Sequence, residues 1–176
     1  MRRVRRGYTL LELMLVLALL IILGALAYPS IDGMYGGVKL RAGADGVRGA
    51  LMQARGHAID ETRAYRFAVV PGRGSYRVAP DSPDYWSGGE PPAPADPNNP
   101  PLVLEDKLPT GIVFVLGGGT SGSGDSGGWA PVVTFLPDGP ASADVDIAIR
   151  LEGGRPLVVR VRAMTGTVSV VREGQP

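Results

Sequence analysis

The stretch Gly7-Tyr8-Thr9-Leu10-Leu11-Glu12-Leu13 decides how this chain of 176 residues is organised, because it joins a basic end to a long apolar run. Four arginines precede it, and from Leu10 to Tyr28 the only charged residue is Glu12. A helix rises about 1.5 Å per residue, so the segment 8–28 is just long enough to cross a hydrocarbon core of about 30 Å. The arginines of the segment 1–7 predict one crossing with a cytoplasmic N-terminus.

Glu12 is the first candidate functional residue. A carboxylate deep in a bilayer costs roughly 2.5 to 3.5 kcal/mol, so an acid at this position indicates a function and needs a partner. Tyr8 lies four residues earlier on the same helical face. Within one chain the helix N-terminus favours the negative charge.

The segment Gly24-Ala25-Leu26-Ala27 is similar to the cleavage site of an ordinary secretory signal. A glycine directly before Tyr8, with an acid at the fifth residue after it, is not a feature of such signals. It resembles the class III signal of type IV prepilins and type II secretion pseudopilins. The resemblance implies that prepilin peptidase cleaves after Gly7, that the new N-terminus at Tyr8 is methylated, and that Glu12 serves assembly.

Composition is consistent with an exported subunit. Four of the 18 basic residues lie in the leader, which leaves 14 against 17 acidic residues in a mildly acidic mature chain. There is no cysteine, so neither a disulfide framework nor a thiolate metal site is expected. Glycine and proline make up 42 of the 176 residues, which predicts many turns and long loops.

The segment 29–61 is expected to be the soluble half of an extended helix. Apolar residues recur there at helical spacing and form one stripe that should pack on a sheet: Leu40, Ala44, Val47, Leu51, Ala54 and Ala58. Several glycines weaken this helix, and Pro29 removes a backbone donor. Pro29 is therefore expected either to kink the helix, as in many type IV pilins, or to end the anchor and begin a second helix.

The remaining segment, 62–176, is expected to be a β-rich globular domain. A hairpin is predicted from Tyr65 to Val78, and further strands are predicted at 112–116, 132–136, 145–151, 157–163 and 168–171. A proline-rich loop, 80–101, and a glycine-rich loop, 117–128, interrupt the pattern. The fold class is α+β, with a long N-terminal helix packed on antiparallel strands.

A narrower resemblance covers the helix end and two later turns. Leu51-Met52-Gln53-Ala54-Arg55-Gly56-His57-Ala58-Ile59, Phe135-Leu136-Pro137-Asp138-Gly139 and Met164-Thr165-Gly166-Thr167-Val168 are similar to the GspH/FimT group. The resemblance implies a minor pseudopilin near the tip of a type II secretion pseudopilus, or alternatively a minor type IV pilin in pilus initiation or DNA uptake. It would be a structural part, not an enzyme.

The same resemblance implies the partners and the location. The partners would be prepilin peptidase, other major and minor pseudopilins or pilins, and the inner membrane, with a secreted substrate as a further partner. The globular domain would be periplasmic. No cofactor and no metal are expected.

Three other functions have weaker support. Gly124-Asp125-Ser126-Gly127-Gly128 spells the nucleophile loop of chymotrypsin-like proteases, with His57 as the only histidine, but it lies in a glycine-rich run where such strings arise by composition. Asp144 and Asp146 lack a third oxygen-rich turn for calcium. A basic strip for DNA would consist of Arg150, Arg160 and Arg162, against which Asp146 and Glu152 count.

Overall fold

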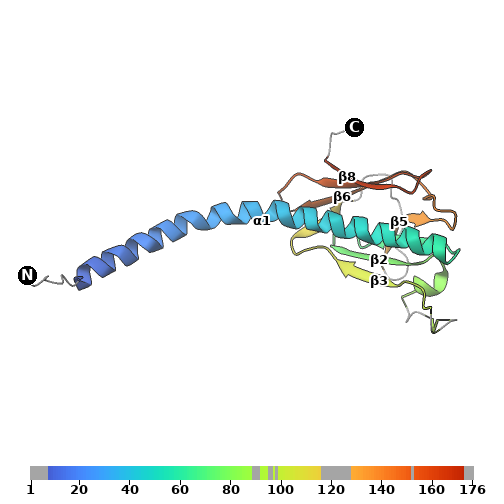
Figure 1. Ribbon diagram of the computed structural model, residues 1–176, viewed down its shortest axis with the longest axis horizontal. Helices are drawn as coiled ribbons and strands as arrows, with labels where there is room; N and C mark the ends of the chain where they lie inside the picture. The colour runs from blue at the N-terminus through green and yellow to red at the C-terminus, as the bar shows by residue number, and fades with distance from the viewer. Residues whose placement is uncertain are drawn as a thin grey trace, which may run out of the picture. The chain divides into compact units, whose positions relative to one another are not determined.

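The computed structural model describes residues 8–88, 92–94, 97, 99–115, 128–151 and 153–172, and within these the side chains of residues 25–34 and 172 are not described. The chain divides into two compact units, 1–38 and 39–176. The elements in chain order are α1 (Leu10–Asp60), β1 (Tyr65–Val69), β2 (Ser75–Pro80), the 3-10 helix η1 (Pro83–Tyr85), β3 (Leu104–Lys107), β4 (Ile112–Val115), β5 (Ala130–Phe135), β6 (Val145–Leu151), β7 (Leu157–Val161) and β8 (Val168–Arg172) (Figure 1).

Helix α1 is continuous from Leu10 to Asp60. It passes through Pro29, so the alternative in which Pro29 begins a second helix is wrong. A proline inside a helix removes one hydrogen bond, and the bonds of the flanking turns keep the backbone helical. A kink at Pro29 stays a prediction.

The C-terminal end of α1 is closed by two backbone hydrogen bonds. The N–H of Arg63 donates to the carbonyl of Ala58 at 3.1 Å, and the N–H of Thr62 donates to the carbonyl of Ile59 at 3.3 Å. This is the Schellman arrangement, in which the residue after the cap takes a left-handed conformation. That residue is usually glycine, but here it is Thr62, with φ of 50°.

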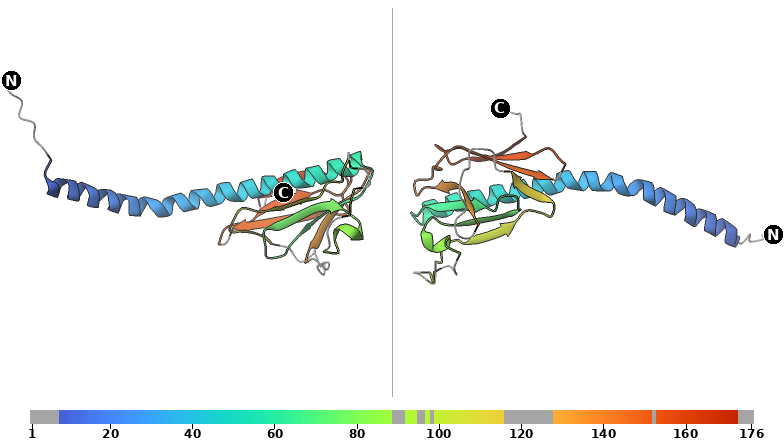
Figure 2. Two further views of the ribbon diagram at one scale, coloured as in Figure 1. Left: turned by 90° about the horizontal axis from the view of Figure 1, so that it is seen from below. Right: turned by 180° about the vertical axis from the view of Figure 1, so that it is seen from behind.

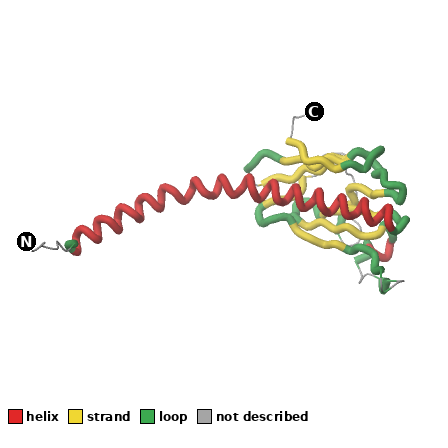
Figure 3. Tube along the Cα trace, in the orientation of Figure 1, coloured by secondary structure: helices red, strands yellow, loops and turns green. Residues whose placement is uncertain are grey.

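The strands of the second unit form two antiparallel sheets of four (Figures 2 and 3). The first sheet has the order β3-β2-β1-β5 and the second has the order β4-β6-β7-β8. The strands do not fill the sheets in sequence: after β3 the chain enters the second sheet as β4, returns to the first as β5 beside β1, and then completes the second with β6, β7 and β8. The two sheets are thus interlocked by one exchange of strands.

The predicted hairpin is confirmed as β1 and β2, with the register Tyr65 to Pro80 and Val69 to Tyr76. The other five predicted strands are found within two residues of their expected bounds, apart from Leu116, which lies outside the described residues. Two elements were not predicted: β3 directly follows the proline-rich loop, and η1 lies inside it. The α+β class is confirmed.

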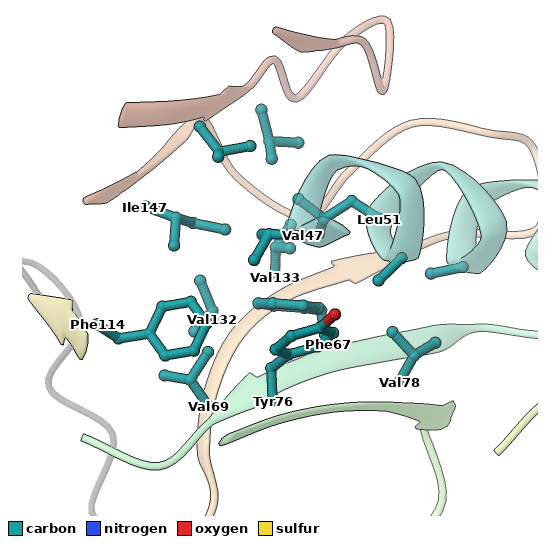
Figure 4. Packing of buried hydrophobic residues seen from close by; sticks show 14 of the residues in the cluster. Val47, Leu51, Phe67, Val69, Tyr76, Val78, Phe114, Val132, Val133 and Ile147 are labelled. Carbon is teal, nitrogen blue, oxygen red and sulfur yellow. The ribbon is translucent and has the colours of Figure 1, made fainter. Parts of the chain in front are cut away.

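The core lies between α1 and both sheets. The predicted stripe of α1 is confirmed, since Ala44, Val47, Leu51, Ala54 and Ala58 are fully buried and Leu40 packs at the edge of the cluster. Figure 4 shows Val47 of α1 between Ile147 of β6 and Phe67 of β1, with Leu51 next to Val47 on the helix. The rings of Phe67 and Tyr76 stack with centroids 5.8 Å apart, which adds a specific geometry to the burial of apolar area.

A second, smaller cluster covers the other face of the first sheet. It contains Tyr85, Trp86 and Trp129, packed on Ala68 of β1 and Ala79 of β2. The guanidinium of Arg77 lies between the two indole rings, 5.6 Å from the centroid of Trp86 and 6.0 Å from that of Trp129. Part of the proline-rich segment is therefore structural: Trp86 donates from Nε1 to the carbonyl of Pro80 at 2.9 Å.

Candidate functional site

The helix that carries Glu12 has a defined start. Thr9 is its N-cap: the backbone N–H of Glu12 donates to the Thr9 side-chain Oγ1 at 3.2 Å and to the Thr9 carbonyl at 3.1 Å. Glu12 is thus the third residue of the helix, where an acid interacts favourably with the helix dipole. The threonine-x-x-glutamate spacing of a capping box is the sequence signal for this role of Thr9, which was not predicted. Tyr8 lies just outside the helix, and Gly7 lies outside the described residues.

The first turns of α1 expose apolar side chains on every side. From Leu10 to Leu23 the large apolar side chains are between 46% and 77% exposed, and Tyr8 is 79% exposed. A helix that is apolar all round is stable only when lipid or other protein covers it. Within the described part of the chain, no helix meets the length and hydropathy required of a membrane span.

The three segments that resemble the GspH/FimT group meet at one point. Nε of Arg55 donates to the carbonyl of Gly139 at 2.9 Å, which ties α1 to the turn after β5. Gly166, in the turn between β7 and β8, has φ of 61° and lies so close that a Cβ there would be 2.5 Å from Nε of Arg55 and would also overlap the Gly139 carbonyl. We call these three residues the Arg55 clip. It bonds the end of α1 to the turn after β5 and brings the turn between β7 and β8 into close contact with both groups.

His57 is engaged next to the clip. Its Nδ1 and Oε1 of Glu61 are 2.8 Å apart, and the hydroxyl of Tyr65 donates to Oε2 of Glu61, also at 2.8 Å. The Tyr65 hydroxyl in turn accepts the N–H of Leu102 at 3.0 Å. Burial, together with the bond to Glu61, raises the pKa of Tyr65. This network joins the end of α1 to the first sheet. Ser126, which was considered with His57 for a protease site, lies outside the described residues.

The two aspartates considered for calcium have other partners. Asp146 accepts from Nε and Nη2 of Arg160 at 2.8 and 3.0 Å, and this paired bond from Arg160 holds the pKa of Asp146 below its usual range. Asp144 accepts the N–H of Ala163 at 2.7 Å and lies 4.0 Å from Arg162. Among the described residues no cluster of three or more metal-ligating side chains is found.

The same pairs count against DNA binding by the predicted basic strip. Of its three arginines, Arg160 and Arg162 face aspartates, and Arg150 lies exposed on β6. A surface whose guanidinium groups are neutralised by carboxylates offers little of the charge that binds a phosphate backbone. The geometry therefore does not support a nucleic-acid site on this face.

A pocket of about 550 Å³ opens beside Glu61, between the end of α1 and the segment around η1. Its charged lining residues are Glu61, Arg63, Asp81 and Asp84. Two of these carboxylates are occupied: Glu61 by His57 and Tyr65, and Asp81 by Arg66 and by the Thr134 hydroxyl. The hydrogen bonds of Glu61 and Asp81 thus join the segments that line the pocket to the end of α1 and to the first sheet.

Known proteins resemble this chain both in its N-terminal segment and in its fold. Residues 2–28 match the prokaryotic N-terminal methylation motif. Two solved structures of EpsH, a minor pseudopilin of the type II secretion system of Vibrio cholerae, share the fold. One has a TM-score of 0.53 at 15% identity, covering 78% of this chain and 99% of that one; the other has 0.54 at 17%, covering 78% and 96%. No curated protein sequence matches the chain.

The motif and the fold occur together in one chain. An N-terminal methylation motif is followed here by a helix packed on two antiparallel sheets, in the arrangement found in EpsH. The chain thus carries an N-terminal methylation motif and has a fold similar to that of the minor pseudopilin EpsH.

Proposed function

We propose that this protein is a minor pseudopilin of a type II secretion system, a structural subunit near the pseudopilus tip that supports protein export. The observation that carries the proposal is the combination of a methylation motif at residues 2–28 with a globular fold that aligns with nearly all of both EpsH chains. It acts by assembly and not as an enzyme.

Processing would begin at the inner membrane. The precursor crosses it once, with the leader in the cytoplasm and the globular unit in the periplasm, and prepilin peptidase cleaves after Gly7 and methylates Tyr8. The all-round exposure of the apolar side chains from Leu10 to Leu23 supports a helix that is covered by lipid in the membrane and by neighbouring helices in the filament.

Glu12 would act in the transfer between these two environments. Cleavage gives each neighbouring subunit a cationic α-amino group at Tyr8, and a charge pair in a low dielectric is far stronger than in water. The cap at Thr9 occupies the backbone N–H of Glu12 and not its carboxylate, so the side chain is available for that pair. Other major and minor pseudopilins are therefore the partners.

The intact mass of the protein extracted from membranes tests this proposal. We expect a mature chain that begins at Tyr8 and carries one additional methyl group. Gly7→Val is the matched variant: it should insert, because the arginines and the apolar run are unchanged, but it should stay uncut. A chain that begins after Ala27, or an uncut wild-type chain, would overturn the proposal.

The alternative is a minor type IV pilin in pilus initiation or DNA uptake, since the leader and the helix are common to both machines. The pairing of Arg160 and Arg162 with aspartates counts against the DNA version. Secretion and twitching assays of a strain that lacks the protein separate the two: a secretion system subunit is required for export of the secreted substrate, and a pilin is required for pili.

A further inference from the structure

Three of the four sheet edges in the globular unit are guarded. Strand β3 carries three charged, exposed residues in succession, from Glu105 to Lys107. Strand β4 donates the N–H of Phe114 to the Arg73 carbonyl at 3.2 Å. Along β5 the chain folds back, and the N–H of Ser142 donates to the Thr134 carbonyl at 2.8 Å. Charges and covering segments of this kind prevent an edge from pairing with another chain.

The fourth edge, on β8, lacks such charges and covering segments among the described residues. Residues 168–171 of this strand are valine, serine, valine and valine, and its only charged residue is the last, Arg172. It has no proline or bulge, and among the described residues none donates to or accepts from its outer side. By the rules of sheet edges, an apolar β-branched strand without a guard is a template for a further strand.

The hydrogen-bond register shows which groups this edge offers. The N–H of Arg162 donates to the Thr167 carbonyl at 3.0 Å, and the pairing continues as Arg160 with Ser169 and Val158 with Val171. In an antiparallel ladder the bonded residues alternate, so Ser169 and Val171 bond to β7. The N–H and C=O groups of Val168 and Val170 therefore point to the open edge.

The core is also incomplete at this edge. Inward-facing residues of the neighbouring strands are fully covered, with Val159 at 0% and Ile147 at 1% exposure, whereas Val168 and Val170 are only partly buried. On the outer face a row of apolar residues crosses all four strands and ends on β8: Val115, Ala148, Val158 and Val171. A strand added to β8 would extend the apolar surface of both faces.

We propose that β8 is a docking edge that takes up an extended, uncharged segment rich in β-branched residues from a neighbouring filament subunit as a fifth strand of the second sheet. The occupant is defined by what it must bond and cover. It needs alternate backbone groups for Val168 and Val170, and apolar side chains on both faces. This inference rests on the proposed function, because it assumes that neighbouring subunits are present.

Hydrogen exchange measured residue by residue on the full-length protein is the direct test. In detergent and without other subunits, the amides of Val168 and Val170 should exchange rapidly, while those of Ser169 and Val171 are protected by β7. In filaments assembled with the other pilin-like subunits of the same machine, the amides of Val168 and Val170 should slow at least tenfold. Unchanged exchange in assembled protein would overturn the proposal.

A pair of variants tests the edge independently. Val168→Pro removes an outward N–H at the first residue of an edge strand, where proline is tolerated, whereas Val168→Ala removes the same packing and keeps the N–H. Both should fold and be cleaved alike, and incorporation of Val168→Pro should fall at least fivefold below that of Val168→Ala. Equal incorporation would overturn the proposal.

The remaining outcomes are also distinct. The chain has no cysteine, so Ser169→Cys gives a single thiol on β8. Disulfide-linked homodimers in the assembled state would show that a second copy occupies the edge, and would overturn the neighbouring-subunit version. If the wild-type chain is itself neither cleaved nor incorporated, the proposed function fails. If the wild-type chain is incorporated and Val168→Pro is incorporated as well as Val168→Ala, only this inference is overturned.

Discussion

Arg55 on α1 donates from Nε to the carbonyl of Gly139, a residue 84 positions later in the chain, at 2.9 Å. The bond joins the helix to the turn after β5, and Gly166 from the second sheet packs against both groups. The end of α1 is therefore held by polar contacts as well as by the apolar stripe. Disruption of this clip should loosen the helix from both sheets together.

Replacement of Gly166 by alanine is the sharpest test of the clip. The new Cβ would overlap the Gly139 carbonyl and Arg55 at a φ of 61°, so we expect the free energy of unfolding to fall by at least about 2 kcal/mol. Gly153→Ala is the matched control, because Gly153 also has a positive φ, of 75°, but nothing lies within 4 Å of its Cβ. It should cost only about 1 kcal/mol, for the left-handed conformation alone. Thermal unfolding of the full-length protein in detergent measures both, and equal losses would contradict the clip.

Thr62 stores backbone strain at the end of α1. A β-branched residue at φ of 50° is costly, and the Schellman position it occupies suits glycine. Thr62→Gly should therefore stabilise the protein by up to about 1 kcal/mol, whereas Thr62→Ala should stabilise it less because its Cβ remains. Denaturant unfolding with a constant m-value would establish the difference; a lower midpoint for glycine would show that the Thr62 side chain has a stabilising role.

Glu12→Gln should separate helix capping from assembly. The bond from the backbone N–H of residue 12 to Thr9 does not depend on the side chain, and glutamine also suits a capping box, so insertion and leader cleavage should be unchanged. Loss of the charge should reduce incorporation at least tenfold, measured by crosslinking to neighbouring subunits. Thr9→Ser, which keeps both the cap and Glu12, should incorporate normally. Wild-type yield of Glu12→Gln would show that the carboxylate is satisfied within its own chain.

The raised pKa values of two tyrosines predict that the folded protein loses stability at alkaline pH. Burial raises the pKa of Tyr65 and of Tyr76, reinforced by hydrogen bonds to Glu61 and Asp106 respectively. A group whose pKa is higher in the folded state contributes stability below its unfolded pKa of about 10, and this stability is lost as the pH rises above that value. Ultraviolet absorbance should show late ionisation of two of the six tyrosines, together with unfolding. Ionisation of all six near pH 10 without unfolding would contradict this.

The parts of the fold that follow from short-range patterns were predictable. The stripe that contains Val47 and Leu51 repeats at the helical period, and Tyr65, Phe67 and Val69 alternate at the strand period, so both buried faces could be read from the sequence. Strand β3 could not, because Leu104-Glu105-Asp106-Lys107 has a composition typical of a loop. It is a strand because β2 pairs with it.

The site was predictable only where it is local. Glu12 stands out because one charge interrupts an apolar run, and Thr9 could have been found from the same four residues. The partners of Asp146 could not be found in this way: Arg160 lies 14 residues later and is placed beside it only by the register of β6 and β7. Trp86 was assigned to an irregular loop, and its burial depends on Trp129, in a distant segment.

The exchange of β4 and β5 between the sheets has a consequence for how the globular unit reaches its native state. Tyr65 of β1 pairs with Phe135 of β5, 70 residues away. Strand β4 pairs with β6, which follows β5 in the chain. The stretch of chain that supplies each sheet therefore contains one strand of the other sheet. Such a topology has a high contact order, for which folding is slow and each sheet depends on the other. A chain with this topology is expected to become resistant to proteases in one cooperative step, when strands from both sheets have paired.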